Sequence, residues 1–257
     1  MKKHNIMLSI NVLLTIASFA LIGFITSSLM NYRTFGRIIP VPIESTFNKI
    51  PMNSFVRFEK VIINKETGKE FIVAVGSGVV ISKTETGNVI LTNHHVCTDN
   101  ILTLVQVGPT IKRVRDTHDR IFYTYNIRYN EEIDICLVFA KAMQAPPVKI
   151  ATSPPKKAEV VFNISAPRGI FFPDGDGDEG MAPIIMGIFN GYVLKEGADK
   201  NHPAALFTIN LAPGSSGSGI FNSDGELLGL VHSCFIAYDN LCMGVSYKDL
   251  VEFIKAK

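Results

Sequence analysis

The sequence contains little charge of either sign. Only 19% of its 257 residues are Asp, Glu, Lys or Arg, 47% are hydrophobic, and the formal net charge is +2. This composition excludes an intrinsically disordered chain. The excess charge comes from Lys2 and Lys3, since residues 1–30 contain no acidic residue and residues 31–257 are neutral overall. We therefore expect no nucleic-acid partner, because nothing suggests a basic surface.

Ionisable side chains are absent from residues 5–30. At about 1.5 Å per residue, a helix over this segment is long enough to cross a hydrocarbon layer of about 30 Å. We favour an uncleaved membrane anchor within residues 1–30. A cleavable secretory signal is the alternative, because small residues at 18–20 and 26–28 offer cleavage sites. Either interpretation gives a globular part outside the cytoplasm, anchored through residues 5–30 or secreted.

Cysteines are few, but their even number is compatible with disulfides in an oxidising compartment. Cys234 and Cys242 flank a predicted hairpin whose arms can bring them together, and spacing alone leaves that bridge open. We expect Cys97 and Cys136 to be buried thiols, with a second bridge as the alternative.

Helix signals are also scarce. Short runs rich in Val, Ile, Phe and Tyr are separated by turn sequences, which predicts an all-β barrel or sandwich. The predicted strands are residues 54–63, 70–81, 88–93, 101–107, 121–128, 133–140, 160–164, 186–194, 205–210, 219–222, 227–233 and 242–246. One helix is predicted after Ser246, which can cap it with Asp249 three residues on. Residues 31–52, interrupted by prolines, are predicted to be a tether.

Metal-binding patterns are missing. The chain has neither a His-Glu-x-x-His helix nor a paired Cys-x-x-Cys, so we expect no metal and no cofactor. Residues 174–179 cluster four carboxylates, but their spacing departs from an EF-hand loop, so a solvated acidic loop is preferred over a calcium site. The basic run at residues 112–115 is too short and isolated to indicate a nucleic-acid site.

Ser216 lies in the glycine-rich run GSSGSG at residues 214–219, just before an apolar strand. Glycines permit a sharp turn and close approach of a substrate carbonyl, and the N–H groups of Gly214 and Ser216 can converge on a developing oxyanion. Taken alone, the run is more typical of an ordinary Gly/Ser loop than of a catalytic turn.

Two further residues make a catalytic interpretation stronger. His95 stands where an apolar strand ends, and Asp134 stands at the head of another apolar run. With Ser216, they supply the base, the orienting carboxylate and the nucleophile that attack on a carbonyl requires.

The order of these motifs resembles the trypsin-like (chymotrypsin-fold) serine peptidases, particularly bacterial glutamyl endopeptidases and periplasmic heat-shock proteases. The resemblance covers roughly residues 54–257. It rests on residues 76–81 (GSGVVI), 91–96 (LTNHHV), 134–135 (DI), 213–218 (PGSSGS) and 225–229 (GELLG).

This resemblance implies two six-stranded antiparallel β-barrels with a C-terminal helix in a peptidase domain at residues 53–257, preceded by the transmembrane or signal helix. Barrel 1 would span about 53–145 and barrel 2 about 146–257. It also implies that His95, rather than His94, is the base.

The resemblance says less about cleavage specificity than about the catalytic residues. The position that resembles the base of the primary pocket is Asn210, whose neutral side chain lacks the charge that attracts Lys or Arg. His232 falls one residue later than the pocket histidine of glutamyl endopeptidases, and a one-residue shift in a strand reverses the side-chain direction. Both are candidate pocket residues, with a structural or surface role preferred for His232.

The sequence therefore predicts a serine endopeptidase that hydrolyses polypeptides through a Ser-His-Asp triad. A non-catalytic peptide-binding module on the same fold is the alternative. An esterase with the same acyl-transfer chemistry is a third possibility.

Overall fold

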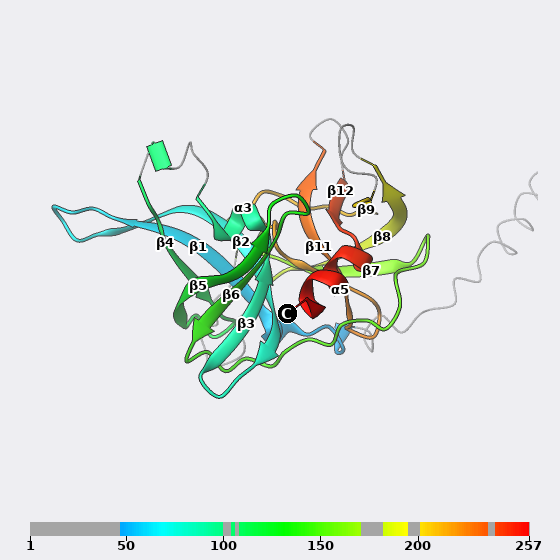
Figure 1. The fold of residues 1–257 in the computed structure, drawn as a ribbon, viewed down its shortest axis with the longest axis horizontal. Helices are drawn as coiled ribbons and strands as arrows, with labels where there is room; N and C mark the ends of the chain where they lie inside the picture. Colours follow the sequence, from blue (N-terminus) through cyan, green and yellow to red (C-terminus); the bar gives the residue numbers. More distant parts are fainter. Residues whose placement is uncertain are drawn as a thin grey trace, which may run out of the picture. The chain divides into compact units, whose positions relative to one another are not determined.

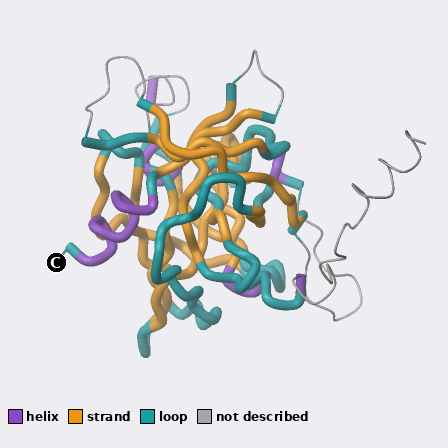
Figure 2. Tube along the Cα trace, turned by 90° about the vertical axis from the view of Figure 1, so that its right-hand side faces the viewer, coloured by secondary structure: helices purple, strands orange, loops and turns teal. Residues whose placement is uncertain are grey.

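The computed structural model describes residues 47–99, 104–105, 108–170, 182–194, 201–235 and 240–256. Over these residues the chain forms two closed barrels of six antiparallel strands each, which confirms the expected all-β fold class (Figures 1 and 2). The strand order is β1-β2-β3-β6-β5-β4 in the first barrel and β10-β11-β12-β9-β8-β7 in the second.

The first barrel contains β1 (Phe55–Ile63), β2 (Glu70–Lys83), β3 (Gly87–Thr92), β4 (Ile111–Arg115), β5 (Ile121–Asn130) and β6 (Ile135–Lys141). The second contains β7 (Val160–Ile164), β8 (Ile184–Val193), β9 (Ala204–Thr208), β10 (Gly219–Phe221), β11 (Leu227–Cys234) and β12 (Leu241–Val245). The helical elements are η1 (Met52–Ser54), α3 (His94–Cys97), η2 (Pro167–Gly169) and α5 (Tyr247–Lys255).

The C-terminal helix α5 is confirmed. The Ser246 hydroxyl caps it by accepting a hydrogen bond from the N–H of Asp249. Its apolar face buries Leu250 and Phe253. At the other end, Arg128 from β5 donates to the carbonyls of Phe253 and Ala256, so a residue of the first barrel satisfies free carbonyls of the helix.

One strand prediction was wrong. Leu104 and Val105, within the strand expected at residues 101–107, are helical, and the rest of that run lies outside the described residues. The strand that completes the first barrel is instead β4. Its basic side chains hid the strand pattern, because Lys112 pairs with Asp99 and Arg113 pairs with Glu59 inside the structure.

Glu59 carries a charge into the first barrel, where its side chain is 0% exposed. Its carboxylate accepts hydrogen bonds from Arg113 at 2.7 Å, from Arg115 at 3.1 Å and from Arg57. Burial alone would raise the pKa of Glu59, but the hydrogen bonds from Arg57 and Arg113 and the charge of Arg115 outweigh burial and hold the pKa below its ordinary value.

Hydrophobic packing joins the two barrels. Each barrel has its own core, and a further cluster combines residues of both. In this shared cluster, Phe55 and Leu91 of the first barrel pack with Phe162 and Leu230 of the second. The same cluster includes Ile50, so residues from the end of the predicted tether pack against the body. This shared core fixes the two barrels against each other.

Both cysteine pairs are disulfides in the structure. Cys234 and Cys242 face each other across β11 and β12. Cys97 and Cys136 join α3 to β6, so the expectation of two buried thiols was wrong. The sequence did not reveal this pairing, because the contact depends on α3 folding back against a strand 39 residues further on.

The predicted membrane anchor and most of the tether lie within residues 1–46, outside the described residues. In the described ranges, none of the helices has both the length and the apolar character needed for a membrane span. The predicted acidic loop at residues 174–179 also lies outside the described residues.

We predict that Glu59→Gln lowers the free energy of unfolding by about 3–5 kcal/mol near neutral pH, because it removes the buried negative charge that Arg57, Arg113 and Arg115 share. Since the folded-state pKa of Glu59 lies below its ordinary value of 4.5, this stabilisation is present above that value and is lost as the pH falls through the lowered pKa. Guanidinium unfolding at several pH values measures both effects. Equal losses at neutral and strongly acidic pH would contradict the assignment.

Candidate active site

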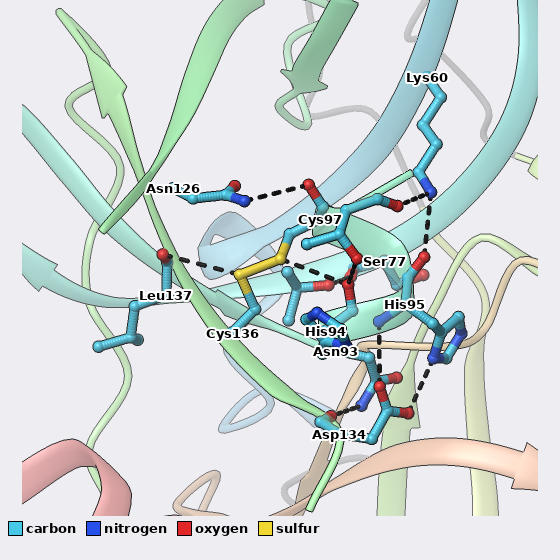
Figure 3. The surroundings of a disulfide bond; sticks show 12 residues. Lys60, Ser77, Asn93, His94, His95, Cys97, Asn126, Asp134, Cys136 and Leu137 are labelled. Atoms are coloured by element: carbon cyan, nitrogen blue, oxygen red, sulfur yellow. Dashed lines mark hydrogen bonds and ion pairs between the residues drawn. A yellow bond between two sulfur atoms is a disulfide. The ribbon is translucent and has the colours of Figure 1, made fainter. Parts of the chain in front are cut away.

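His95, in α3, and Asp134, in the turn before β6, are brought together (Figure 3). Nδ1 of His95 lies 2.8 Å from Oδ2 of Asp134, and Oδ1 accepts a hydrogen bond from the His95 N–H at 3.0 Å. The two carboxylate oxygens thus hold both the ring and the backbone of the histidine. The His95 side chain is 48% exposed, which leaves it accessible to a ligand.

Local backbone structure explains why Asp134 is in position. It ends a turn just before β6 and adopts the left-handed conformation with φ of 53°, which Asp tolerates better than most residues. Its N–H donates to the carbonyl of Glu131, and its own carbonyl accepts from Nδ2 of buried Asn93 at 2.8 Å. These bonds at both ends of the residue hold a backbone conformation that is rare outside glycine.

The adjacent histidine has a different environment. The His94 ring stacks on Tyr129 with a centroid distance of 4.7 Å. Only one of the two neighbouring histidines therefore contacts Asp134.

The Cys97–Cys136 disulfide lies beside this pair (Figure 3). Cys97 comes two residues after His95, and Cys136 comes two residues after Asp134. The bridge therefore ties the helix that carries the imidazole to the strand that follows the carboxylate, which restricts their relative motion.

Two glycines shape the loop that carries Ser216. Gly214 has φ of 101° and Gly217 has φ of 86°, both in the left-handed region. A Cβ on Gly214 would lie 2.3 Å from the Ala166 carbonyl oxygen, and one on Gly217 would lie 2.2 Å from the Ser77 carbonyl oxygen. The loop can therefore approach both neighbouring segments only because these positions have no side chain.

Ser77 of β2 connects this loop to the first barrel. Its N–H donates to the Ser216 carbonyl at 2.8 Å, and its hydroxyl donates to the Gly214 carbonyl at 2.8 Å. The same hydroxyl accepts from the N–H of Ala166 at 3.0 Å. Ser77 is fully buried, so one residue of the first barrel fixes two adjoining loops of the second.

Backbone amides in the loop fall into two groups. The N–H groups of Ser215, Gly217 and Ser218 donate to backbone carbonyls. Those of Gly214 and Ser216 make no hydrogen bond within the described part of the chain. Two amides that belong to one tight turn thus remain available to a negatively charged oxygen.

Two pockets adjoin Ser216. The larger has a volume of about 380 Å³ and contains no ionisable side chain among its described walls. Its walls are Leu211, Ala212, Pro213, Ser215, Ser216, Val231, Ser233, Cys234 and Phe235. The smaller, of about 90 Å³, lies where the barrels meet, because Ser216 shares its wall with His95 and with residues of β1 and β2.

Neither candidate specificity residue lines the larger pocket. Asn210 is exposed outside its walls. His232 is the extra residue of a β-bulge in β11, between the pairs Val231–Gly244 and Ser233–Met243. The bulge interrupts regular alternation, so counting residues along an ideal strand could not place its side chain.

Lys60 is a site residue that the sequence analysis missed. Its side chain lies in the wall of the smaller pocket, although the residue is only 7% exposed. Nζ donates to the carbonyl of His95 at 3.0 Å and to that of Thr98 (Figure 3). Burial lowers the pKa of Lys60, and the charge of Lys112 adds to this effect while Asp99 opposes it. The available signal was the adjacent charged pair Glu59 and Lys60 in a strand whose other residues, apart from Arg57, are apolar.

We predict that Ser77→Ala lowers the free energy of unfolding by about 1–3 kcal/mol, because the buried Ala166 N–H and the Gly214 carbonyl each lose a partner. Guanidinium unfolding measures the change. The matched control is Ser82→Ala, an exposed serine on the same strand, for which a change within about 0.5 kcal/mol is expected. Equal effects of the two substitutions would contradict the proposed connection.

Three solved structures with a similar fold are bacterial proteases. The active form of the Rv3671c protease from M. tuberculosis is 17% identical, has a TM-score of 0.59, and the match covers 83% of this chain and 84% of that chain. A serine-to-alanine mutant of Rv3671c in its inactive form is 16% identical with a TM-score of 0.59, and the match covers 79% of this chain and 86% of that chain. The serine endoprotease from Yersinia pestis is 19% identical with a TM-score of 0.60, and the match covers 82% of this chain and 65% of that chain. At these identities the likeness concerns the fold.

Among curated proteins, none matches this sequence. Residues 76–230 match the family model of the trypsin-like peptidase domain. That range is more than half of the chain and contains His95, Asp134 and Ser216. The chain therefore belongs to the trypsin-like peptidase family.

Proposed function

We propose that the chain is a serine endopeptidase that hydrolyses polypeptides through an acyl-enzyme on Ser216. The observation that carries this proposal is the His95–Asp134 pair at a pocket whose wall also contains Ser216. Acyl transfer requires a base, a carboxylate that orients it and a nucleophilic hydroxyl. The hydrogen-bonded pair of His95 and Asp134 and the Ser216 hydroxyl in its tight turn supply these three groups.

Acylation begins when Oγ of Ser216 attacks the carbonyl carbon of the peptide bond and its proton passes to Nε2 of His95. The Ser216 hydroxyl donates to the His232 carbonyl at 3.4 Å, so a rotation about the Cα–Cβ bond must first turn it toward the imidazole. Asp134 keeps the proton on Nδ1 and stabilises the imidazolium that forms.

The tetrahedral intermediate places negative charge on the former carbonyl oxygen. The N–H groups of Gly214 and Ser216 are the donors proposed to bind it. When the intermediate collapses, the C–N bond breaks and His95 gives its proton to the leaving amine. Water, deprotonated by the same imidazole, then cleaves the ester and regenerates the Ser216 hydroxyl.

The larger pocket supports a preference for an uncharged, apolar side chain on the residue before the scissile bond. Its described walls are mainly aliphatic and aromatic and contain no charge to pair with Lys, Arg, Asp or Glu. Burying an unpaired charge there would cost more than the contacts return.

We also propose that residues 1–30 hold the peptidase domain, placed at residues 53–257, at a membrane or direct its secretion, with the domain outside the cytoplasm. The two disulfides in the described residues support an oxidising environment.

We predict that Ser216→Ala and His95→Ala each lower kcat/KM for a cleaved peptide by about 10⁴-fold or more, whereas His94→Ala leaves it within a few-fold. A phosphonylating probe should label Ser216 in the parent protein, with Oγ displacing the leaving group of the probe, and labelling should fall in parallel in His95→Ala. Peptide mapping by mass spectrometry locates the adduct. A folded parent protein that binds peptides but takes up no label would support the non-catalytic binding module instead.

A panel of peptides that differ only in the residue before the scissile bond tests the larger pocket. Leu, Met or Phe should give at least about tenfold higher kcat/KM than Lys or Glu, since an unpaired charge would have to be desolvated. Preferred cleavage after Lys or Glu would contradict this assignment.

A further inference from the structure

Lys60 brings a positive charge to the smaller pocket beside Ser216. The pocket is lined by Lys60 together with His95, Ser216 and neighbouring residues of β1 and β2. Since the residue is only 7% exposed, its ammonium group is largely withdrawn from bulk water. A buried charge of this kind requires compensation, either from the protein or from a ligand.

Within the chain, this compensation is incomplete. Two N–H groups of the ammonium are used by the carbonyls of His95 and Thr98, and an ammonium has three. No carboxylate of the described residues forms an ion pair with Lys60, although it feels the charge of Asp99. Asp99 is itself engaged by Lys112 at 2.7 Å and by the Thr110 hydroxyl.

The contrast with the preceding residue is informative. Glu59 lies next to Lys60 in β1 and is bonded by three arginines, whereas Lys60 is bonded only by neutral carbonyls. Residues 100–103 and 106–107, which follow Asp99 in the sequence and lie outside the described residues, include no Asp or Glu. The positive charge in the pocket wall therefore has no dedicated acidic partner in the described structure.

Chemistry determines which part of a substrate enters this pocket. In acyl transfer, His95 protonates the amine that leaves, so the residue carrying that amine must lie on the histidine side of Ser216. The smaller pocket contains both His95 and Ser216, whereas His95 is absent from the walls of the larger pocket. The smaller pocket consequently receives the residue that follows the scissile bond.

We propose that Lys60 is a specificity-determining residue that selects a short acidic side chain, aspartate above all, immediately after the scissile bond. This inference rests on the proposed function. The carboxylate accepts the remaining N–H of the ammonium and supplies the missing counter-charge, and the volume of about 90 Å³ favours a short side chain.

The test uses peptides that share one efficiently cleaved sequence and carry Asp, Asn or Lys directly after the scissile bond. Mass spectrometry verifies the cleavage position for each peptide. For the parent protein, we expect kcat/KM to be at least about tenfold higher for Asp than for Asn, and lower still for Lys. A parent protein that does not distinguish Asp from Asn overturns the proposal.

Lys60→Met keeps the length of the side chain and removes its charge. We expect the Asp-to-Asn ratio of kcat/KM to fall to within about twofold of unity. The control is Lys69→Met, which removes an exposed lysine from the turn end of the same β1–β2 hairpin and should keep the parent ratio. A Lys60→Met ratio equal to that of the parent overturns the proposal.

The ratio also separates specificity from a purely structural role. Lys60 bonds to the carbonyls of His95 and Thr98, so its loss can loosen α3 and lower turnover of every peptide. Such a loss affects the Asp and Asn peptides equally and leaves their ratio unchanged. Retention of the charge in Lys60→Arg should preserve a preference for Asp over Asn.

Two measurements distinguish failure of this inference from failure of the proposed function. The phosphonylating probe places no substrate residue in the smaller pocket, so labelling of Ser216 reports only on the nucleophile. If the parent protein is labelled but shows no preference for Asp, the role of Lys60 is overturned and the peptidase function is not. Peptide binding to Ser216→Ala, followed by fluorescence anisotropy, requires no catalysis. Tighter binding of Asp than Asn peptides that disappears in Ser216→Ala/Lys60→Met, with no labelling of the parent, supports the acidic subsite and overturns the peptidase function.

Discussion

The candidate site depends on the contact between β2 of the first barrel and the loop that carries Ser216. Ser77 makes this contact through its N–H to the Ser216 carbonyl and through its hydroxyl to the Gly214 carbonyl. The histidine and the carboxylate come from one barrel and the serine from the other, so their alignment is only as good as this connection. The shared hydrophobic core determines how the two barrels pack against each other. The hydrogen bonds of the buried Ser77 hydroxyl then fix the position of the loop.

Two adjacent charged residues of β1, Glu59 and Lys60, differ in how the protein compensates their charges. Glu59 is surrounded by arginines, and its charge contributes to the stability of the barrel. Lys60 points to backbone carbonyls at the pocket wall and carries a charge that the chain itself only partly compensates. Natural proteins retain imperfectly satisfied groups mainly where a ligand completes them, and this difference led us to distinguish a structural residue from a substrate-binding one.

The fold was predictable from sequence because short apolar runs and turn sequences report strands directly, and Ser246 with Asp249 reports the helix cap. β4 was missed because its basic residues are neutralised by distant acids, which no local pattern reveals. The contact between His95 and Asp134 was expected from motif order, but the Cys97–Cys136 bridge and the connections of Ser77 depend on tertiary contacts. The side-chain direction at His232 depends on a bulge that residue counting does not detect.

Closure of the two barrels has a further consequence. Each of the twelve described strands pairs with two neighbours, so neither sheet has an edge strand. The pairing does not cover every strand along its whole length, however, because β2 spans Glu70–Lys83 and pairs with β3 only over Val79–Lys83. A bound peptide must therefore make its backbone hydrogen bonds to such partly paired stretches of strand, to strand ends or to connecting loops. Closure also limits the strand edge available for association between copies of the chain, which is a useful property for a protein that is proposed to bind unfolded segments of other proteins.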